Sequence, residues 1–151
     1  MTTQLHDTGE EFAIKDLFRE DQITKPTSVS IGLFNDSTDS LADDSDTGDI
    51  TTEPTGSNYA GQTADFSSSD FSTGDNASGN WEVVIADQVY DTSDSSQDVD
   101  AYYVEIEYDS DDASDGGTPA QHLYWTGDLD QTYDLNSVDQ FTLSGAGLEI
   151  N

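Results

Sequence analysis

The chain has 151 residues and a formal charge of −30, because 33 acidic residues face only three basic ones. Like charges at this density destabilise a compact state unless salt screens them, and at 1 M salt the Debye length falls to about 3 Å. The composition therefore indicates a protein adapted to molar salt. No Lys or Arg follows Lys25, which excludes a surface that neutralises nucleic-acid phosphates. The lack of cysteine excludes disulfides and thiolate metal sites.

Length and hydropathy limit the architecture further. A chain of this length is expected to form one domain. No stretch approaches the roughly 20 apolar residues that a membrane-spanning helix needs, so we expect no membrane span. The polar N-terminus lacks the apolar core of a secretory signal, so we expect synthesis in the cytoplasm.

The N-terminal segment, residues 1–25, is expected to be helical from Thr8 to about Arg19. Thr8 and Glu11 have the spacing of a capping box, in which each side chain bonds the backbone N–H of the other residue. An apolar stripe at helical spacing follows, formed by Ala13, Ile14, Leu17 and Phe18. All three basic residues of the chain also lie here, namely Lys15, Arg19 and Lys25. We therefore expect this segment to be an interface.

From Pro26 onward, residues 26–151 have the pattern of β-structure. Short strands are expected at 28–34, 59–66, 80–90, 101–108, 121–127, 138–143 and 147–150. The polar stretch 35–58 is expected to be a long loop held by Leu41 and Ile50, and the acidic stretches 91–100 and 109–119 to be hairpin loops. The pattern predicts an all-β fold, an antiparallel β-sandwich of jelly-roll-like type with one short N-terminal α-helix.

No pattern in the chain indicates catalysis, so we do not expect an enzyme. No GxSxG or HExxH motif is present, and two distant histidines, His6 and His122, do not suggest a metal site. Weak candidates for loosely bound cations from a salty medium are the carboxylates Asp43, Asp44, Asp46 and Asp49. No cofactor is expected. Asn35 and Asn76 begin sequons for N-glycosylation.

Several short motifs, in the same order, resemble those of a family of small virion proteins from tailed phages and haloarchaeal tailed viruses, labelled tail fiber, head fiber or decoration proteins. The helix ends in a Leu-Phe pair at 16–19, and a strand of the "LYVGLY" type follows at 29–34. An "E-x-x-G-x-x-Y-A-R-Q" turn is matched at 53–62, except that Gly61 replaces its Arg. A segment like "LYYGxL" lies at 123–129, and a strand-Gly-strand pattern closes the chain at 141–150.

This resemblance implies a structural protein of a haloarchaeal tailed-virus particle, located in the virion. A capsid-surface decoration or turret component is the first expectation, and a tail or tail-fiber component the second. Its partners would be other virion proteins, such as the major capsid protein or a tail protein, and further copies of itself. The candidate interface residues are Leu17, Phe18, Arg19, Lys25 and Tyr59.

A glycan-binding module for the host surface is an alternative function of another class. The environment of the tryptophans distinguishes it from the structural role. A glycan-binding module requires an exposed aromatic cluster flanked by Asp and Asn. The structural role predicts that Trp81 and Trp125 are buried.

Overall fold

The computed structural model describes the backbone of residues 3–18, 26, 28–76, 78–108 and 120–150. Within these ranges β-strands are the predominant secondary structure. In chain order the elements are β1 (Thr3–Leu5), α1 (Asp7–Phe18), β2 (Ser28–Phe34), α2 (Asp36–Asp39), the 3-10 helix η1 (Thr47–Asp49), β3 (Gln62–Asp65), β4 (Phe71–Asp75), β5 (Trp81–Ile85), β6 (Gln88–Asp91), β7 (Asp98–Tyr108), β8 (Ala120–Asp134), the 3-10 helix η3 (Leu135–Ser137), β9 (Gln140–Leu143) and β10 (Gly147–Ile150).

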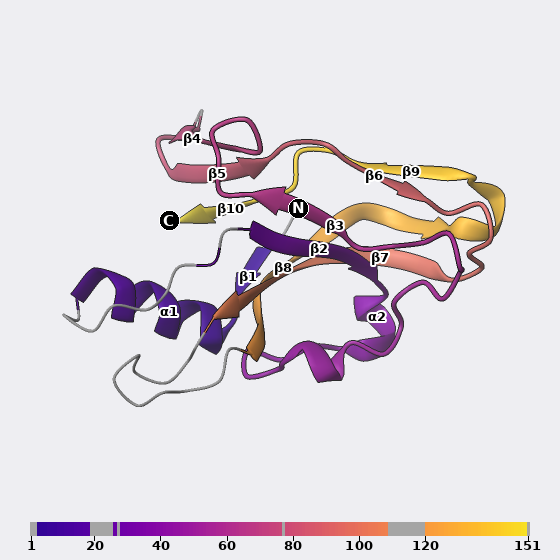
Figure 1. The fold of residues 1–151 in the computed structure, drawn as a ribbon, viewed down its shortest axis with the longest axis horizontal. Helices are drawn as coiled ribbons and strands as arrows, with labels where there is room; N and C mark the ends of the chain where they lie inside the picture. Colours follow the sequence, from indigo (N-terminus) through magenta and orange to yellow (C-terminus); the bar gives the residue numbers. More distant parts are fainter. Residues whose placement is uncertain (1–2, 19–25, 27, 77, 109–119, 151) are drawn as a thin grey trace.

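The strands form two layers, as Figure 1 shows. One layer is a five-stranded antiparallel sheet in the order β1-β8-β7-β2-β3. The other layer consists of a three-stranded sheet, β10-β5-β4, and the pair β6-β9. The predicted all-β antiparallel sandwich with an N-terminal helix is confirmed. The edge strand β1 comes from the N-terminal segment 1–25, so that segment also contributes to the sandwich.

Two glycine–tyrosine pairs fix the register at the centre of the large sheet. Gly32 of β2 lies opposite Tyr103 of β7, and Gly127 of β8 lies opposite Tyr102. A Cβ atom on either glycine would collide with the facing tyrosine ring. Each ring therefore covers the backbone of its partner strand, which compensates for the missing glycine side chain.

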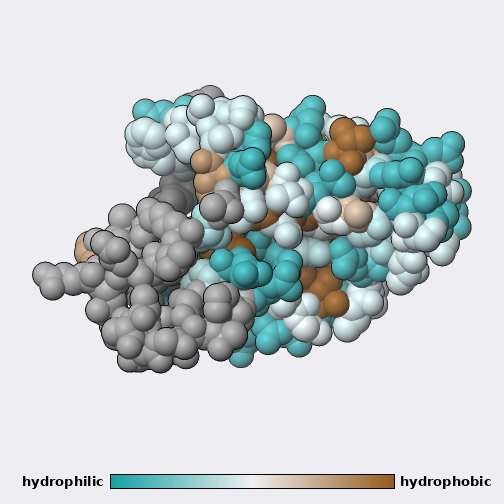
Figure 2. Space-filling view, viewed as in Figure 1, coloured by the Kyte–Doolittle hydropathy of each residue, from teal (hydrophilic) through white to brown (hydrophobic). Residues whose placement is uncertain are grey.

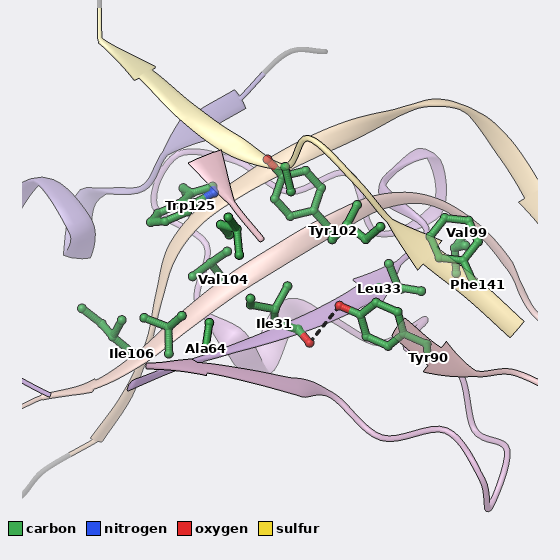
Figure 3. Close-up of a cluster of buried hydrophobic side chains, with 14 of the residues drawn as sticks. Ile31, Leu33, Ala64, Tyr90, Val99, Tyr102, Val104, Ile106, Trp125 and Phe141 are labelled. Atoms are coloured by element: carbon green, nitrogen blue, oxygen red, sulfur yellow. Dashed lines mark hydrogen bonds between the residues drawn. The ribbon is translucent and has the colours of Figure 1, made fainter. Parts of the chain in front are cut away.

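The main core lies between the two layers (Figure 3). Alternate residues of β2 and β7 point into it, as the period of a half-buried strand requires. Its fully buried members include Val29, Ile31, Leu33, Tyr90, Val99, Tyr102, Val104, Ile106 and Tyr108. Two of these tyrosines also bond backbone of the opposite layer: the Tyr90 hydroxyl donates to the Ile31 carbonyl at 3.2 Å (Figure 3), and Tyr102 bonds Gly147.

The outer face of the large sheet is covered by the long loop. A second cluster forms there from Phe34, Ala101, Tyr103 and Leu123, and Leu41 and Ile50 of the loop pack on it. The prediction that these two loop residues hold the loop is confirmed. The same loop contains α2 and η1, which the sequence pattern did not predict.

Some predicted strand limits are wrong. The stretch 80–90 forms two strands, β5 and β6, because the chain passes from one small sheet to the other at Ala86 and Asp87. Strand β4 was not expected at all. The stretch 91–100 is no hairpin loop, since it joins β6 to β7 in a different sheet. The predicted hairpin loop 109–119 lies outside the described residues.

Candidate interaction surface

The first turn of α1 is fixed to the sandwich through His6. The ring is fully buried, with Nδ1 at 3.2 Å from the Asp43 carbonyl and Nε2 at 3.1 Å from the Thr126 hydroxyl. Because a carbonyl only accepts, Nδ1 carries the proton and Nε2 accepts from Thr126. Burial lowers the pKa of His6, which keeps this neutral form. Gly9 adds close contact, because its backbone lies directly against Tyr124 of β8.

The other end of α1 exposes apolar side chains. Ile14 is 58% exposed and Phe18 is 81% exposed. The expected apolar stripe therefore faces solvent at these two positions. Among the candidate interface residues, the side chains of Leu17, Arg19 and Lys25 lie outside what the structure describes, as does that of Thr8 in the expected capping box. Phe18 is accessible, as an interface residue must be.

Tyr59 is placed differently from Phe18, inside the fold. Its ring is half-buried and stacks on Tyr90, with ring centroids 5.8 Å apart and planes 11° apart. Its hydroxyl accepts from the Leu33 backbone N–H at 2.8 Å. Strand β3 pairs with β2 only as far as Ile31, so this hydroxyl satisfies the next free N–H of the strand. The structure thus gives Tyr59 a packing role.

The rest of the Glu-x-x-Gly-x-x-Tyr motif is also structural. Glu53 accepts a hydrogen bond from the Tyr103 hydroxyl at 2.8 Å. Gly56 leaves no room for a side chain, because Asp94 and Ser95 lie against it. The Asp94 carboxylate accepts hydrogen bonds from the hydroxyl and N–H of Ser57 and from the N–H of Asn58. These bonds hold the pKa of Asp94 below its ordinary value.

Gly61, which stands where the motif has Arg, is exposed, unlike Gly56. A Cβ atom at Gly61 would only touch the Ile31 carbonyl at 3.5 Å.

The weak cation candidates do not converge. Asp46 and Asp49 form a reciprocal capping box around η1, and Asp43 bonds Gln4 through its side chain. Asp44 is exposed. Among the residues that the structure describes, no three His, Asp or Glu side chains are grouped so that they could hold a metal ion.

The sequon asparagines are used in local hydrogen bonds. Asn35 caps α2 by accepting from the Thr38 N–H at 2.9 Å, and its amide donates to the Asp98 carbonyl. Asn76 accepts from the Ser78 N–H, and its amide donates to Glu149 at 2.7 Å. Both asparagine side chains are thus engaged within the fold.

The tryptophans have opposite environments. Trp125 is buried in the core at 3% exposure, as expected, whereas Trp81 is 61% exposed and the expectation that it is buried is wrong. Trp81, Val83 and Ile85 alternate along β5 and so share one face of the sheet. On that face Ile85 is buried at 2% in the core, Val83 is half-buried, and Trp81 is open. The inner face of the small sheet therefore extends beyond the core.

Carboxylates lie on both faces of this overhang. Asp75 pairs with Trp81 across β4–β5 and shares its face, whereas Glu82 and its partner Glu149 across β5–β10 lie on the opposite face. The amides of Asn76 and Asn80 donate to the two oxygens of Glu149 at 2.7 and 2.8 Å. A hollow of about 180 Å³ near Glu82 and Glu149 is lined by Thr3 and by residues of β5 and β10 that include Val83 and Leu148.

Polar residues cover most of the visible face of the molecule, with small separate apolar areas, as Figure 2 shows.

A second hollow on the outer face of the large sheet holds two carboxylates. It measures about 260 Å³ and is lined by Thr47, Ile50, Glu53, Tyr103, Glu105 and Gln121. Burial, with a smaller contribution from the charge of Glu53, raises the pKa of Glu105. One of the two carboxylates, Glu53, accepts the hydrogen bond of the Tyr103 hydroxyl at 2.8 Å.

No family model, curated protein or solved structure matches the chain. In the described part of the chain, no helix has the length and apolar character needed to cross a bilayer. Among the described residues, the two most exposed large apolar side chains are Phe18 at the end of α1 and Trp81 on the overhang, and we take these two places as the candidate interaction surface.

Proposed function

We propose that this protein is a non-enzymatic structural component of the particle of a haloarchaeal tailed virus. A capsid-surface decoration or turret component is the first choice, and a tail component the second. The single observation that carries the proposal is the exposure of Phe18, 81%, at the end of a helix whose sequence neighbourhood holds all three cations of an otherwise anionic chain. An exposed aromatic residue beside the only positive charges is what a docking segment requires.

The rest of the molecule fits a passive role in brine. The sandwich has a closed core and an acidic exterior, and a net charge far from zero keeps a protein soluble and apart from its neighbours. Attachment must then come from a small, distinct part of the surface. The motifs quoted above, which resemble those of small virion proteins, also support this assignment.

The direct test is quantitative mass spectrometry of purified virions, with the copy number set against the major capsid protein. Copies comparable in number to capsid subunits support a head component, and a handful supports the tail. Absence from the particle would overturn the proposal.

A matched pair of variants tests the role of α1. Phe18→Asp should abolish incorporation into particles, because a charge replaces the apolar contact. Phe66→Asp makes the same change at another exposed phenylalanine and should be incorporated normally. Unfolding curves in molar KCl check that both variants fold. Normal incorporation of Phe18→Asp would remove α1 from the attachment site.

One observation favours a second candidate, a glycan-binding module. The open ring of Trp81 offers a stacking surface, and Asp75 supplies a carboxylate on the same face of the sheet. Titration with host surface glycans would then quench the Trp81 fluorescence, while the buried Trp125 would not respond. The Trp81→Ala variant, which lacks the open ring, is the control for this experiment.

A further inference from the structure

We propose that His6 is a pH-operated latch, which holds the N-terminal strand and helix, residues 3–18, against the sandwich at neutral pH and releases them in weak acid. The inference goes beyond the proposed function, because it concerns a movement within one copy of the chain. It can be measured on the purified protein without virions.

His6 lies at the joint between β1 and α1, where this segment is attached to the sandwich. Strand β1 pairs with β8 over only three residues, and directly after it the His6 N–H donates to the Tyr124 carbonyl at 3.1 Å. On the other side, the Asp43 carbonyl accepts from the Asp7 N–H at 3.2 Å, and the Asp43 carboxylate accepts from the Gln4 amide at 3.1 Å. The joint therefore has two anchors, β8 and Asp43.

The neutral His6 ring connects these two anchors. The ring is fully buried, its Nδ1–H donates to the Asp43 carbonyl at 3.2 Å, and its Nε2 accepts from the Thr126 hydroxyl of β8 at 3.1 Å. A neutral imidazole has one donor and one acceptor, so this form satisfies both partners at once.

A proton on Nε2 disturbs this arrangement in two ways. The Thr126 hydroxyl has to rotate from donating to accepting, and a positive charge is enclosed where water does not reach the ring. Burial therefore lowers the pKa of His6, although the carbonyl and charge of Asp43 and the charge of Asp36 act in the opposite direction. The charged ring is more stable in water, which it reaches when residues 3–18 leave the sandwich.

Among the described residues, the charged groups around this joint are all acidic. Asp43 lies in the long loop, Asp36 begins α2, and Asp7 and Glu10 lie in the first turn of α1. Strand β8 presents the uncharged Thr126 hydroxyl to the ring. Nearby carboxylates favour the protonated ring, so it is burial that keeps the ring neutral while the latch is closed.

The sign of the pH effect follows from the lowered pKa of His6. In the released segment the ring titrates near the ordinary histidine value of about 6.5. The held segment binds this proton less tightly, so the latch is complete above about pH 6.5 and weakens as the pH falls toward the pKa of the buried ring. Glu105 has a raised pKa and contributes with the opposite sign, so it does not cause a loss of stability in this range.

The test is hydrogen–deuterium exchange of the purified full chain in 3 M KCl at pH 5, 6 and 7, with each rate corrected for the intrinsic pH dependence of exchange. Peptides from residues 3–18 report on the latch, and peptides from β7 report on the sandwich. We expect the protection of residues 3–18 to fall by up to about tenfold per pH unit below pH 6.5, and the protection of β7 to stay constant.

Three variants assign the effect to His6. His6→Gln does not titrate, yet its amide can donate to Asp43 and accept from Thr126, so its protection should not depend on pH between 5 and 7. Thr126→Val removes the hydroxyl that donates to Nε2 and should move the loss of protection to higher pH. His122→Gln makes the matched change at the other histidine and should respond as the wild type does.

Constant protection of residues 3–18 in the wild type would overturn the inference, as would a His6→Gln variant that keeps the wild-type response. Parallel losses in residues 3–18 and in β7 would mean that the whole sandwich opens, which also overturns a local latch. If His6→Gln does not fold, Thr126→Val decides, because an unshifted response of this variant contradicts the role of the ring.

The outcome is separate from that of the proposed function. A working latch in a protein that is absent from virions would contradict only the proposed function. A segment 3–18 that stays fixed at every pH, in a protein abundant in virions, would contradict only this inference.

Discussion

The Tyr102 hydroxyl and the backbone of Gly147 exchange two hydrogen bonds across the sandwich. The hydroxyl donates to the Gly147 carbonyl at 2.9 Å and accepts from the Gly147 N–H at 3.0 Å. Tyr102 belongs to β7 at the centre of the large sheet, and Gly147 begins β10 of the small sheet. Because β10 pairs with β5, this contact also fixes the strand that carries Trp81.

Replacement of this tyrosine should measure the link between the layers. Tyr102→Phe leaves a shielded N–H and a carbonyl of Gly147 without their partner, which costs about 1–3 kcal/mol of unfolding free energy. Tyr133→Phe removes a hydroxyl that bonds Asp130 at the surface and should change stability by less than about 0.5 kcal/mol. Denaturant unfolding in molar KCl compares the two. Equal losses would mean that the Tyr102 hydroxyl does not join the layers.

The strands that were predicted well have a strong period of two. Val29, Ile31 and Leu33 alternate with small residues, and β2 begins and ends as expected. Strand β4 has the sequence FSTGD, in which a single aromatic residue gives no period. The apolar run at 80–90 hides a change of sheet, since the Ile85 N–H donates to Ala146 and the Ala86 N–H to Asp70. Only the tertiary structure decides such a break.

Only part of the candidate interaction surface was predictable from the sequence. Phe18 was predicted as an interface residue because it ends the apolar stripe of the helix beside Arg19, and it is exposed. Burial of Tyr59 depends on the place where β3 ends, and exposure of Trp81 depends on how far the small sheet extends beyond the core. Both are properties of how sheets are stacked, which a single sequence does not encode locally.

Two glycines should respond in opposite ways to the same substitution. At Gly56 a Cβ would lie 2.7 Å from the Ser95 hydroxyl and collide with Asp94, so Gly56→Ala should destabilise by about 1–3 kcal/mol. At Gly74 of β4 nothing lies within 4 Å of a Cβ, so Gly74→Ala should be neutral or stabilise by up to about 1 kcal/mol. Thermal unfolding measures both. A stable Gly56→Ala variant would show that the contact with Asp94 is loose.

Salt should control the stability of the whole chain. With a net charge of −30, repulsion within the folded state falls as the Debye length shrinks from about 10 Å at 0.1 M to about 3 Å at 1 M. We expect the unfolding temperature to rise steeply between 0.1 and 3 M KCl. The double variant Asp44→Asn with Asp87→Asn, both at exposed positions, should need less salt for the same stability. An identical salt curve for this variant would assign the effect to hydrophobic burial instead of charge screening.

The half-buried carboxylate Glu105 should make a pH-dependent contribution of known sign. Burial raises its pKa in the folded state above that of the unfolded chain, near 4.3. The folded state therefore binds this proton more tightly, and the resulting stability is complete below the unfolded pKa and is lost as pH rises through the folded pKa. Glu105→Gln removes the ionisation, so at pH 7 the variant should be more stable than the wild type.

The higher stability of Glu105→Gln relative to the wild type should vanish as the pH falls below about 4, because Glu105 is then protonated in both the folded and the unfolded state. Glu107→Gln is the matched control, since it removes the same charge from an exposed position of the same strand. Unfolding free energies at pH 3.5, 5 and 7 in 3 M KCl would be compared for the three proteins. If the two Gln variants differ from the wild type by the same amount at every pH, the gain reflects a general loss of repulsion. If only Glu105→Gln gains with rising pH, the buried position is the cause.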